Sequence, residues 1–203
     1  MNVLWVYAHP KEAAGLELPS GLELGVGKIE ATLSLARRLA QDPPAAVVNF
    51  GVAGAWARSG LDVGDVCLVV EETLADEGVA TADGFEDLRA LRLAERVLWS
   101  ADAALTDRLA ATLPGIARVR GTTVSTCSGT DALAQAYAER TQAAVETMEG
   151  AAVARVCEAF GVPWAQVRAI SNRTGDRDRG GWDLRRAKTQ LHAAMQRLLE
   201  QLA

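Results

Sequence analysis

The chain has 203 residues, of which 49% are apolar and 23% charged, and its formal net charge at pH 7 is −5. This length suits one domain with a sizeable core, and the negative charge gives no electrostatic basis for binding nucleic acid or a membrane surface. The apolar runs are too short to span a bilayer, and residues 1–7 lack the basic start of a signal peptide, so we expect a cytoplasmic protein.

Strand-like and helix-like runs alternate along the chain, without an internal repeat or a low-complexity linker. Apolar, β-rich runs predict strands at 3–8, 45–50, 63–71, 119–125, 143–146 and 164–170. Helical patterns occur at 28–41, 102–113, 131–140, 149–160 and about 183–202. This alternation predicts a single α/β domain over residues 1–203, with a largely parallel or mixed central sheet flanked by helices.

Several helix boundaries are marked by capping residues and helix breakers. Asp102 and Thr130 are the predicted N-caps of two helices, and the segments 42–44 and 161–163 contain the prolines that end two others. In the helix at 28–41, one face carries Ile29, Leu33, Ala36 and Ala40.

The three cysteines, Cys67, Cys127 and Cys157, are widely spaced and odd in number. This pattern predicts buried, reduced thiols and argues against a disulfide framework or a zinc site.

Polar residues that follow the predicted strands are the candidates for a site, because ligands of α/β sheets collect at the carboxyl ends of strands. These candidates are Glu12 and the segments 49–54, 125–130, 146–149 and 171–172.

Each feature also has a simple structural interpretation. The segment 24–28 lacks the full phosphate-loop spacing and 51–55 lacks Gly-x-Gly-x-x-Gly, so both are typical of tight turns. Taken alone, Glu12 is a solvated loop carboxylate, Glu149 favours a helix N-terminus, and Asn172 is a helix cap. Their order along the chain is more specific than any one of them.

In that order, Glu12 is followed by G-V-G-K-I-E-A, N-F-G-V-A-G-A, V-G-D-V, E-T-M-E-G-A-A-V-A and R-A-I-S-N. The order resembles the purine nucleoside phosphorylase and nucleosidase superfamily over nearly the whole chain. Its near members are the 5′-methylthioadenosine/S-adenosylhomocysteine nucleosidases and the futalosine hydrolases. M-E-G-A-A, followed by I-S-N and a tryptophan ten residues later, is similar to the futalosine hydrolases in particular. The segment between Glu12 and Gly25 is shorter than is typical of the family.

The resemblance implies a single-domain nucleoside phosphorylase-like fold and an N-glycosyl hydrolase that needs no metal or organic cofactor. The implied reaction cleaves futalosine into hypoxanthine and a dehypoxanthinyl sugar, which is a step of an alternative menaquinone pathway. The resemblance also implies a homo-oligomer, at least a dimer, because a neighbouring subunit often closes the 5′ pocket in this family.

The resemblance assigns the sugar and the attacking water to two carboxylates. Breaking an N-glycosidic bond passes through a ribosyl cation, which must be stabilised until the nucleophile arrives. Glu149 would hold the 2′- and 3′-hydroxyls, and Met148 would pack on the ribose. Glu12 would act as the general base on water, a role that typically contributes at least about a hundredfold in rate.

Asn172 is predicted to select the base. Adenosine-type nucleosidases carry Asp at this position, which can donate to N7 and accept from a 6-amino group. An amide can instead donate to O6 and accept from protonated N7. A buried amide donor facing an amino group would be left unpaired at roughly 1–3 kcal/mol, so hypoxanthine is favoured over adenine. By analogy, further base contacts come from the backbone of Ser128, Gly129 and Thr130.

The 5′ substituent of futalosine is a carboxyphenyl ketone, for which the resemblance implies contacts with His9, Val26 and Trp182. A flat aromatic tail suits stacking on Trp182, although a tryptophan here could equally anchor the last helix. The tail carboxylate requires a cation, for which the candidates are His9, Arg173, Arg177 and Arg179.

The nucleophile is predicted from a missing phosphate site. Hexameric phosphorylases of the superfamily bind phosphate partly through an Arg and a Ser, where this chain has Asn49 and Val52. A dianion without a guanidinium partner is poorly held, so water is favoured unless Lys28 or Arg168 compensates.

Three other functions remain as alternatives: a methylthioadenosine/adenosylhomocysteine nucleosidase, a true phosphorylase, and a nucleoside-binding or Rossmann-like regulatory module without turnover. Asn172 argues against the first. The joint presence of Glu12 and Glu149 argues against the last, because binding alone requires no water-activating base.

Overall fold

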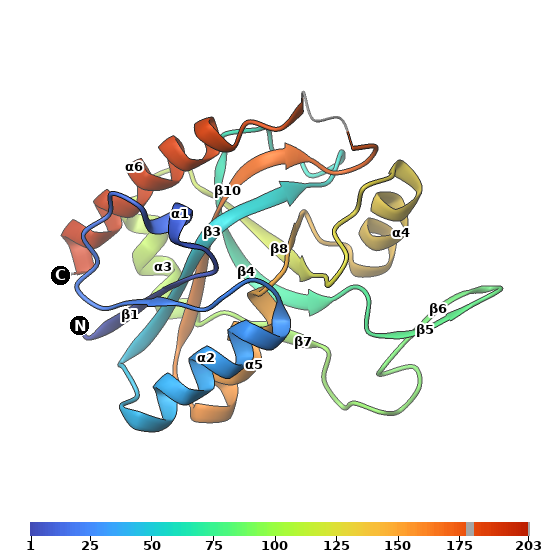
Figure 1. The fold of residues 1–203 in the computed structure, drawn as a ribbon, viewed down its shortest axis with the longest axis horizontal. Helices are drawn as coiled ribbons and strands as arrows, with labels where there is room; N and C mark the ends of the chain where they lie inside the picture. Colours follow the sequence, from blue (N-terminus) through green and yellow to red (C-terminus); the bar gives the residue numbers. More distant parts are fainter. Residues whose placement is uncertain (178–180, 203) are drawn as a thin grey trace.

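The computed structural model describes residues 1–177 and 181–202 (Figure 1). In chain order, its elements are β1 (Val3–Tyr7), α1 (Pro10–Ala13), β2 (Gly21–Glu23), α2 (Lys28–Gln41), β3 (Ala46–Ala55), β4 (Val66–Leu74), β5 (Gly78–Thr81), β6 (Gly84–Asp87), β7 (Leu98–Ser100), α3 (Ala103–Thr112), β8 (Ala117–Thr123), α4 (Asp131–Thr141), β9 (Val145–Thr147), α5 (Gly150–Phe160), β10 (Trp164–Arg173) and α6 (Leu184–Leu202).

A mixed sheet forms the centre of the fold, as predicted. β1 pairs in parallel with β2 and β3, and β3 pairs in parallel with β10. β10 and β4 run antiparallel, β4 and β8 parallel, and β9 joins β8 to β3. The strands β3, β10, β4, β8 and β9 therefore close into a ring, to which β1 and β2 are added as an extension.

Helices cover the sheet on both sides (Figure 1). α3 and α6 pack over β1, β3 and β10, in a core that contains Phe50, Val167 and Met195. α2 and α5 cover the opposite side, where Leu35 and Val153 are fully buried. The parallel strands β1, β3 and β10 end at the same edge of the sheet, which lies between α1, α6 and the start of α5.

The predicted helices are present, and their caps explain their boundaries. The Asp102 side chain accepts a hydrogen bond from Leu105 N at 2.7 Å, and Thr130 Oγ1 accepts one from Leu133 N at 3.2 Å. Gly161, at the C-terminus of α5, has φ of +64°, a left-handed conformation that glycine adopts at low cost.

The buried face of α2 differs from the stripe described in the sequence. Ile29 is 81% exposed and Leu33 is 43% exposed, whereas Ala31, Leu35 and Leu39 are fully buried. The helix carries two apolar stripes, and packing against α5 selects the one at Ala31, Leu35 and Leu39.

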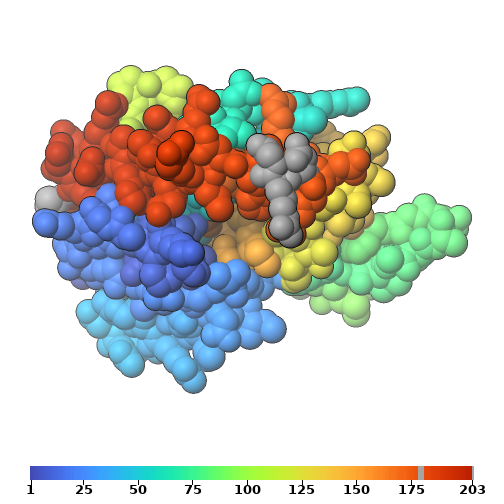
Figure 2. Space-filling view, turned by 45° about the horizontal axis from the view of Figure 1, so that its top comes forward, coloured from blue at the N-terminus to red at the C-terminus, as the bar shows by residue number. Residues whose placement is uncertain are grey.

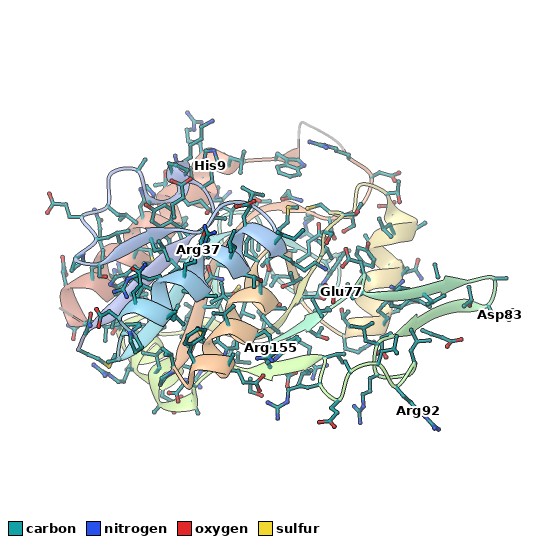
Figure 3. The ribbon with its side chains drawn as sticks, turned by 60° about the horizontal axis from the view of Figure 1, so that its bottom comes forward. His9, Arg37, Glu77, Asp83, Arg92 and Arg155 are labelled. Carbon is teal, nitrogen blue, oxygen red and sulfur yellow. The ribbon has the colours of Figure 1, made fainter. Side chains whose placement is uncertain are left out.

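Several short, exposed elements of the structure were not predicted from the sequence. They include the one-turn helix α1, the three-residue strands β2 and β7, and the hairpin formed by β5 and β6. The hairpin extends away from the body of the molecule, and Figure 3 shows Asp83 near its tip. β3 is also longer than predicted, because it continues beyond Phe50 to Ala55.

The prediction of buried thiols holds for two of the three cysteines. Cys67 and Cys157 are buried, and burial raises the pKa of each thiol to about 12. Cys127 is instead exposed, because it lies in the loop that connects β8 to α4.

Within the described residues, no helix combines the length and the apolar character that crossing a bilayer requires.

Candidate active site

A cavity of about 800 Å³ lies at the carboxyl ends of β1, β3 and β10. Figure 2 shows the hollowed face, where the blue N-terminal segment meets the red helix α6 and the orange segment before α5. The predicted site residues that line it are His9, Glu12, Val26, Ser128, Met148, Glu149, Asn172 and Trp182. The fold therefore brings together residues that are up to 173 positions apart in the chain, from His9 to Trp182.

Glu12 is held in place by main-chain donors. One carboxylate oxygen accepts hydrogen bonds from Ala8 N at 3.0 Å and His9 N at 3.2 Å, and the other accepts one from Val52 N at 2.9 Å. The side chain crosses above Gly51, where any Cβ would collide with the Glu12 carboxylate. Glycine at position 51 is therefore required for the observed position of Glu12.

Glu149 lies directly before α5 and is 5% exposed. Its Oε1 accepts a hydrogen bond from Gly27 N at 2.8 Å, which fixes the carboxylate against the turn before α2. Burial raises the pKa of Glu149, whereas the charge of Arg168 and the Gly27 hydrogen bond lower it. Met148 lines the cavity beside it, so both residues of the M-E pair face the same space.

Asn172 stands near the end of β10, after an irregularity in the pairing of that strand with β3. Its Oδ1 accepts a hydrogen bond from Ser171 Oγ at 2.8 Å, and its Nδ2 donates one to Arg173 O at 3.1 Å. An amide has two N–H donors and two lone pairs on its oxygen. One donor and one acceptor of Asn172 therefore remain for a ligand.

Only one of the three predicted loop contacts with the base lines the cavity. Ser128 does so, with Gly129 and Thr130 placed outside the lining. The Gly129 carbonyl accepts a hydrogen bond from Arg177 N at 3.2 Å, and the Thr130 side chain caps α4. The Gly129 carbonyl and the Thr130 hydroxyl thus have partners in the fold.

Glu146 lines the cavity beside Ser128, although no role was predicted for it. Ser128 N donates to Oε1 at 3.2 Å and Oε2 at 3.3 Å, and Ser128 Oγ also donates to this carboxylate. Burial raises the pKa of Glu146 to about 6, against the lowering effect of the Ser128 hydrogen bonds. Glu146 and Asn172 both lie next to Gly54, on the strands that flank β3.

The three residues predicted near the 5′ substituent line the cavity. Trp182 is 40% exposed, and the guanidinium of Arg177 lies 5.6 Å from its ring centroid. Val26 is 52% exposed. The Nδ1 atom of His9 accepts a hydrogen bond from Lys11 N at 3.1 Å, so His9 also caps α1.

Of the described cations proposed for the tail carboxylate, His9 lines the cavity, and Arg173 and Arg177 do not. Arg173 pairs with Asp62, and Arg177 lies over Trp182. Arg179 lies outside the described residues. The cavity is instead lined by Lys11 of α1 and by Arg185, Lys188, Thr189 and His192 of α6. The spacing 185, 188, 192 places these side chains on one face of a helix, but the sequence alone does not show that this face meets the cavity.

Two buried charged residues lie outside the cavity lining: Arg168, which was considered only as a possible phosphate ligand, and Glu72, for which no role was predicted. Arg168 is 1% exposed, and its Nε and Nη2 atoms have no hydrogen-bond partner among the described residues. Glu72 is fully buried and accepts hydrogen bonds from Gln166 Nε2 at 2.7 Å and Thr123 Oγ1 at 3.0 Å. Burial raises the pKa of Glu72 to about 7, against the lowering effects of Gln166, Arg168 and Thr123.

Lys28 and Asn49 were both considered in the prediction that the chain lacks a phosphate site. Each is bound to other side chains of the protein. Lys28 Nζ pairs with Asp76 at 2.8 Å and Glu77 at 2.9 Å, and Asn49 Nδ2 donates to Gln166 Oε1 at 2.8 Å. Over residues 1–177 and 181–202, no three His, Cys, Asp or Glu side chains are grouped so that they could hold a metal ion.

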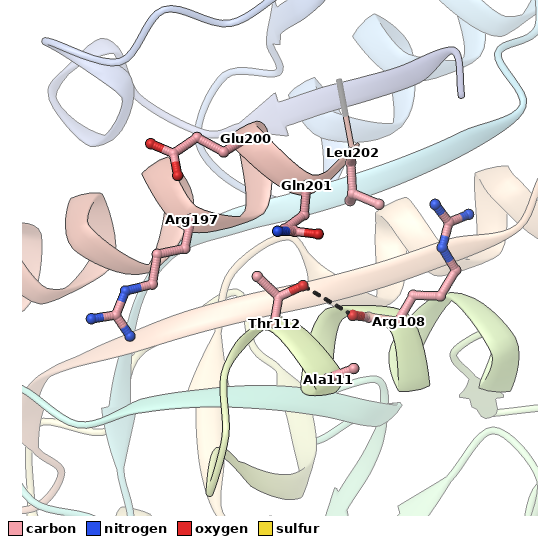
Figure 4. Close-up of a pocket in the computed structure, with 7 residues that line it drawn as sticks. All are labelled: Arg108, Ala111, Thr112, Arg197, Glu200, Gln201 and Leu202. Carbon is pink, nitrogen blue, oxygen red and sulfur yellow. Dashed lines mark hydrogen bonds between the residues drawn. The ribbon is translucent and has the colours of Figure 1, made fainter.

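A second depression lies between the end of α3 and the end of α6 (Figure 4). It contains Arg108, Thr112, Arg197 and Glu200 and none of the predicted site residues. The cavity that contains Glu12, Glu149 and Asn172 is therefore the candidate active site.

The sequence pattern of the phosphorylase superfamily matches residues 19–202, and the chain belongs to this superfamily.

Within the superfamily, a futalosine hydrolase of Thermus thermophilus is 40% identical over 181 residues, which cover 88% of this chain and 80% of that protein. A 5′-methylthioadenosine/S-adenosylhomocysteine nucleosidase of Actinobacillus succinogenes is 35% identical over 170 residues, covering 78% of this chain and 69% of that protein. Among solved structures, a futalosine hydrolase mutant of Helicobacter pylori has a TM-score of 0.84 at 16% identity and covers 98% of both chains. The predicted superfamily, fold and N-glycosyl hydrolase class are confirmed.

Proposed function

We propose that the protein hydrolyses the N-glycosidic bond of futalosine and releases hypoxanthine and dehypoxanthine futalosine. The observation that carries this proposal is the presence in one cavity of two carboxylates, Glu12 and Glu149, together with an amide, Asn172. The similarity to a futalosine hydrolase over 88% of the chain supports the same conclusion.

Glu149 and Met148 hold the ribose in this proposal. A carboxylate accepts hydrogen bonds from both hydroxyls of a cis diol, and its charge stabilises the ribosyl cation that forms as the base leaves. Glu149 keeps acceptor capacity for this role, because the Gly27 N–H donates to Oε1 and a carboxylate has about four lone-pair positions.

Glu12 activates the attacking water. Its carboxylate accepts three main-chain hydrogen bonds, and an ionised carboxylate has about four lone-pair positions. One position is thus left to accept the proton of a water molecule. The three donors fix the direction of this lone pair, as a positioned general base requires.

Asn172 recognises a 6-oxopurine. Its remaining N–H donates to O6, and its remaining lone pair accepts the N7 proton that the departing base carries. The Arg173 carbonyl supports this orientation of the amide, because a carbonyl oxygen can only accept a hydrogen bond and therefore faces the Nδ2 atom. An adenine would bring its 6-amino donor against the Asn172 N–H, so hypoxanthine is the preferred leaving group.

Water is the proposed nucleophile. Of the two basic residues that could have replaced the missing phosphate ligands, Lys28 is paired with Asp76 and Glu77, and Arg168 is 1% exposed and is not among the residues that line the cavity. Phosphate at the face of the ribose that Glu12 occupies would also meet a carboxylate, which repels a dianion.

A methylthioadenosine/adenosylhomocysteine nucleosidase is the second candidate, because a relative of that name is 35% identical over 78% of the chain. The two candidates differ in the base released, so one assay separates them. Purified protein is given futalosine, aminofutalosine and 5′-methylthioadenosine, each with and without phosphate, and the bases are quantified by chromatography.

We expect hypoxanthine from futalosine at a rate independent of phosphate, and much slower release of adenine from the other two nucleosides. Faster adenine release would favour the second candidate, and a requirement for phosphate would favour a phosphorylase.

A cytoplasmic location and an assembly of at least two subunits stay predictions. The first rests on features of the sequence and the second on the family resemblance, and sizing of the purified protein by light scattering tests the second.

A further inference from the structure

Basic side chains from two separate elements line one side of the active-site cavity. Lys11 comes from α1, and Arg185 and Lys188 come from the first turns of α6. Positions 185 and 188 are neighbours on a helix surface. Ala187 and Leu191 on the adjoining face are fully buried against the sheet, which turns Arg185 and Lys188 toward the cavity. Figure 3 shows His9, two residues before Lys11, close to α6.

These three cations have no carboxylate partner among the residues that the structure describes. The ion pairs found there include Lys28, Arg38, Arg96, Arg118, Arg120, Arg155 and Arg173, but none of Lys11, Arg185 and Lys188. The candidate active site of a chain with a net charge of −5 therefore carries three cations that form no ion pair within the described residues.

The acidic residues of the same cavity are engaged elsewhere. The oxygens of Glu12 accept main-chain hydrogen bonds, Glu149 accepts from Gly27, and Glu146 accepts from Ser128. His192 forms a hydrogen bond with the carbonyl oxygen of Glu12 at 2.9 Å, so its ring joins α6 to α1. The carboxylates of the cavity thus have hydrogen-bond donors in the fold, whereas Lys11, Arg185 and Lys188 form no ion pair within the described residues.

We propose that Lys11, Arg185 and Lys188 form an anion-binding subsite that holds a carboxylate at the end of the substrate's 5′ substituent. A guanidinium matches the two oxygens of a carboxylate, and the two ammonium groups add charge. Trp182 lines the same side of the cavity and offers a flat surface to an aromatic group between ribose and carboxylate.

This inference rests on the proposed hydrolysis of futalosine and specifies which nucleosides the site accepts. The volume of about 800 Å³ is in the upper part of the range of roughly 300–1,000 Å³ that is typical of sites for drug-sized ligands, so the cavity has room for such a substituent. A nucleoside with a neutral tail leaves the three cations without a partner. The subsite therefore selects for an anionic tail.

The test compares two substrates that share a base and a ribose, futalosine and 5′-methylthioinosine, which has a neutral tail. The ratio of their kcat/KM values is measured for the wild type, for Lys11→Gln, and for the double variant Arg185→Gln/Lys188→Gln. Arg197→Gln is the matched control, because Arg197 lies on the same helix about 18 Å further along and belongs to the depression of Figure 4. Circular dichroism checks that each variant is folded.

We expect the ratio to fall about tenfold for Lys11→Gln and about 100-fold for the double variant, as charge-assisted hydrogen bonds are lost. The control should keep the wild-type ratio. Unchanged ratios in folded variants that still cleave both nucleosides would overturn the subsite and leave the proposed function intact. Failure of the wild type to cleave either nucleoside would refute the proposed function itself.

A second test of the subsite uses the wild-type protein alone. Calorimetry with 3-acetylbenzoate and with acetophenone compares an anionic and a neutral aromatic ketone, and inorganic phosphate is titrated as a third probe. We expect binding of 3-acetylbenzoate alone, weakened by salt. Equal binding of the two ketones would overturn the proposal. Phosphate binding that accelerates base release and is lost in the double variant would assign the three cations to phosphate and also overturn it.

Discussion

Glu12 is positioned by the main chain and not by other side chains. Donors from Ala8 and His9 follow β1, and the Val52 donor lies on β3, so two neighbouring strands fix one carboxylate. A glutamine in the same place would turn its NH₂ group against at least one of these N–H donors, in addition to losing the basic oxygen.

We therefore expect Glu12→Gln to lower kcat by at least about 100-fold, the usual contribution of a positioned general base, with substrate affinity reduced much less. Hypoxanthine release gives kcat, and calorimetry with substrate gives the affinity. Wild-type turnover in the variant would remove Glu12 from the mechanism.

The amide of Asn172 is oriented by Ser171 on one side and by the Arg173 carbonyl on the other. We expect Asn172→Asp to shift the preference of the enzyme from 6-oxopurine to 6-aminopurine nucleosides. A mismatched buried donor costs roughly 1–3 kcal/mol, so the ratio of kcat/KM values should change by about 10- to 100-fold.

The measurement compares inosine-type and adenosine-type substrates that carry the same 5′ group. Ser171→Ala is the control, because it loosens the amide without changing its hydrogen-bonding groups. The same selectivity in wild type and Asn172→Asp would contradict base reading by this residue.

At the scale of elements, the start of α5 is fixed by a close approach of buried polar groups. A Cβ at Gly150 would collide with the Glu72 carboxylate, and Gln166 lies nearby. Gly150 N also donates to Thr147 Oγ1 at 3.2 Å, and Ala151 N donates to Thr123 Oγ1 at 2.7 Å. The glycine of M-E-G-A-A thus allows α5 to begin directly after Glu149.

Gly150→Ala should therefore destabilise the fold by about 1–3 kcal/mol, the usual cost of overpacking a buried position. Gly129→Ala is the matched control, since nothing lies within 4 Å of a Cβ there. Urea unfolding of both variants measures the difference. Equal stabilities would show that the Glu72 side chain can move aside without cost.

The sequence predicted the elements that carry a strong local signal. The helices α3 and α4 begin after capping side chains, and α5 ends at a left-handed glycine, so α3, α4 and α5 were found with nearly correct bounds. β2, β7 and the β5–β6 hairpin are three or four residues long and largely exposed, and such strands have little apolar alternation to detect. In α2, two apolar stripes compete, and only the position of α5 decides between them.

The residues that line the cavity also divide into those with a local sequence signal and those without one. Glu12, Glu149 and Asn172 were predicted from motifs at or near the ends of strands, and all three line the cavity. Lys11, Arg185 and Lys188 also line it but were not predicted, because charged residues on an amphipathic helix normally face solvent and the docking of α6 beside α1 determines that these line the cavity.

At the scale of the whole molecule, buried carboxyl groups make the stability depend on pH. The pKa of Glu72 is raised from an ordinary 4.5 to about 7, and that of Glu146 from 4.5 to about 6, both mainly by burial. Between pH 4.5 and about 7 for Glu72, and between pH 4.5 and about 6 for Glu146, the carboxyl group is protonated in the folded chain and ionised in the unfolded chain. The contribution of both groups to the free energy of unfolding therefore decreases as pH rises through this window.

We expect Glu72→Gln to reduce this dependence, because glutamine keeps an acceptor for Gln166 but does not ionise. Urea unfolding of wild type and variant at about pH 5 and about pH 8 measures the change, and the variant should lose less stability at the higher pH. Parallel losses in the two proteins would show that Glu72 does not titrate in this range.

Fixing the water-activating group through peptide N–H donors separates two aspects of the chemistry. In the proposed reaction, the activation of water depends on the course of the polypeptide after β1 and within β3, whereas the choice of substrate tail depends on side chains of α1 and α6. We therefore expect that the residues around the tail can be replaced, to admit a different 5′ group, without displacing the carboxylate that is proposed to activate water.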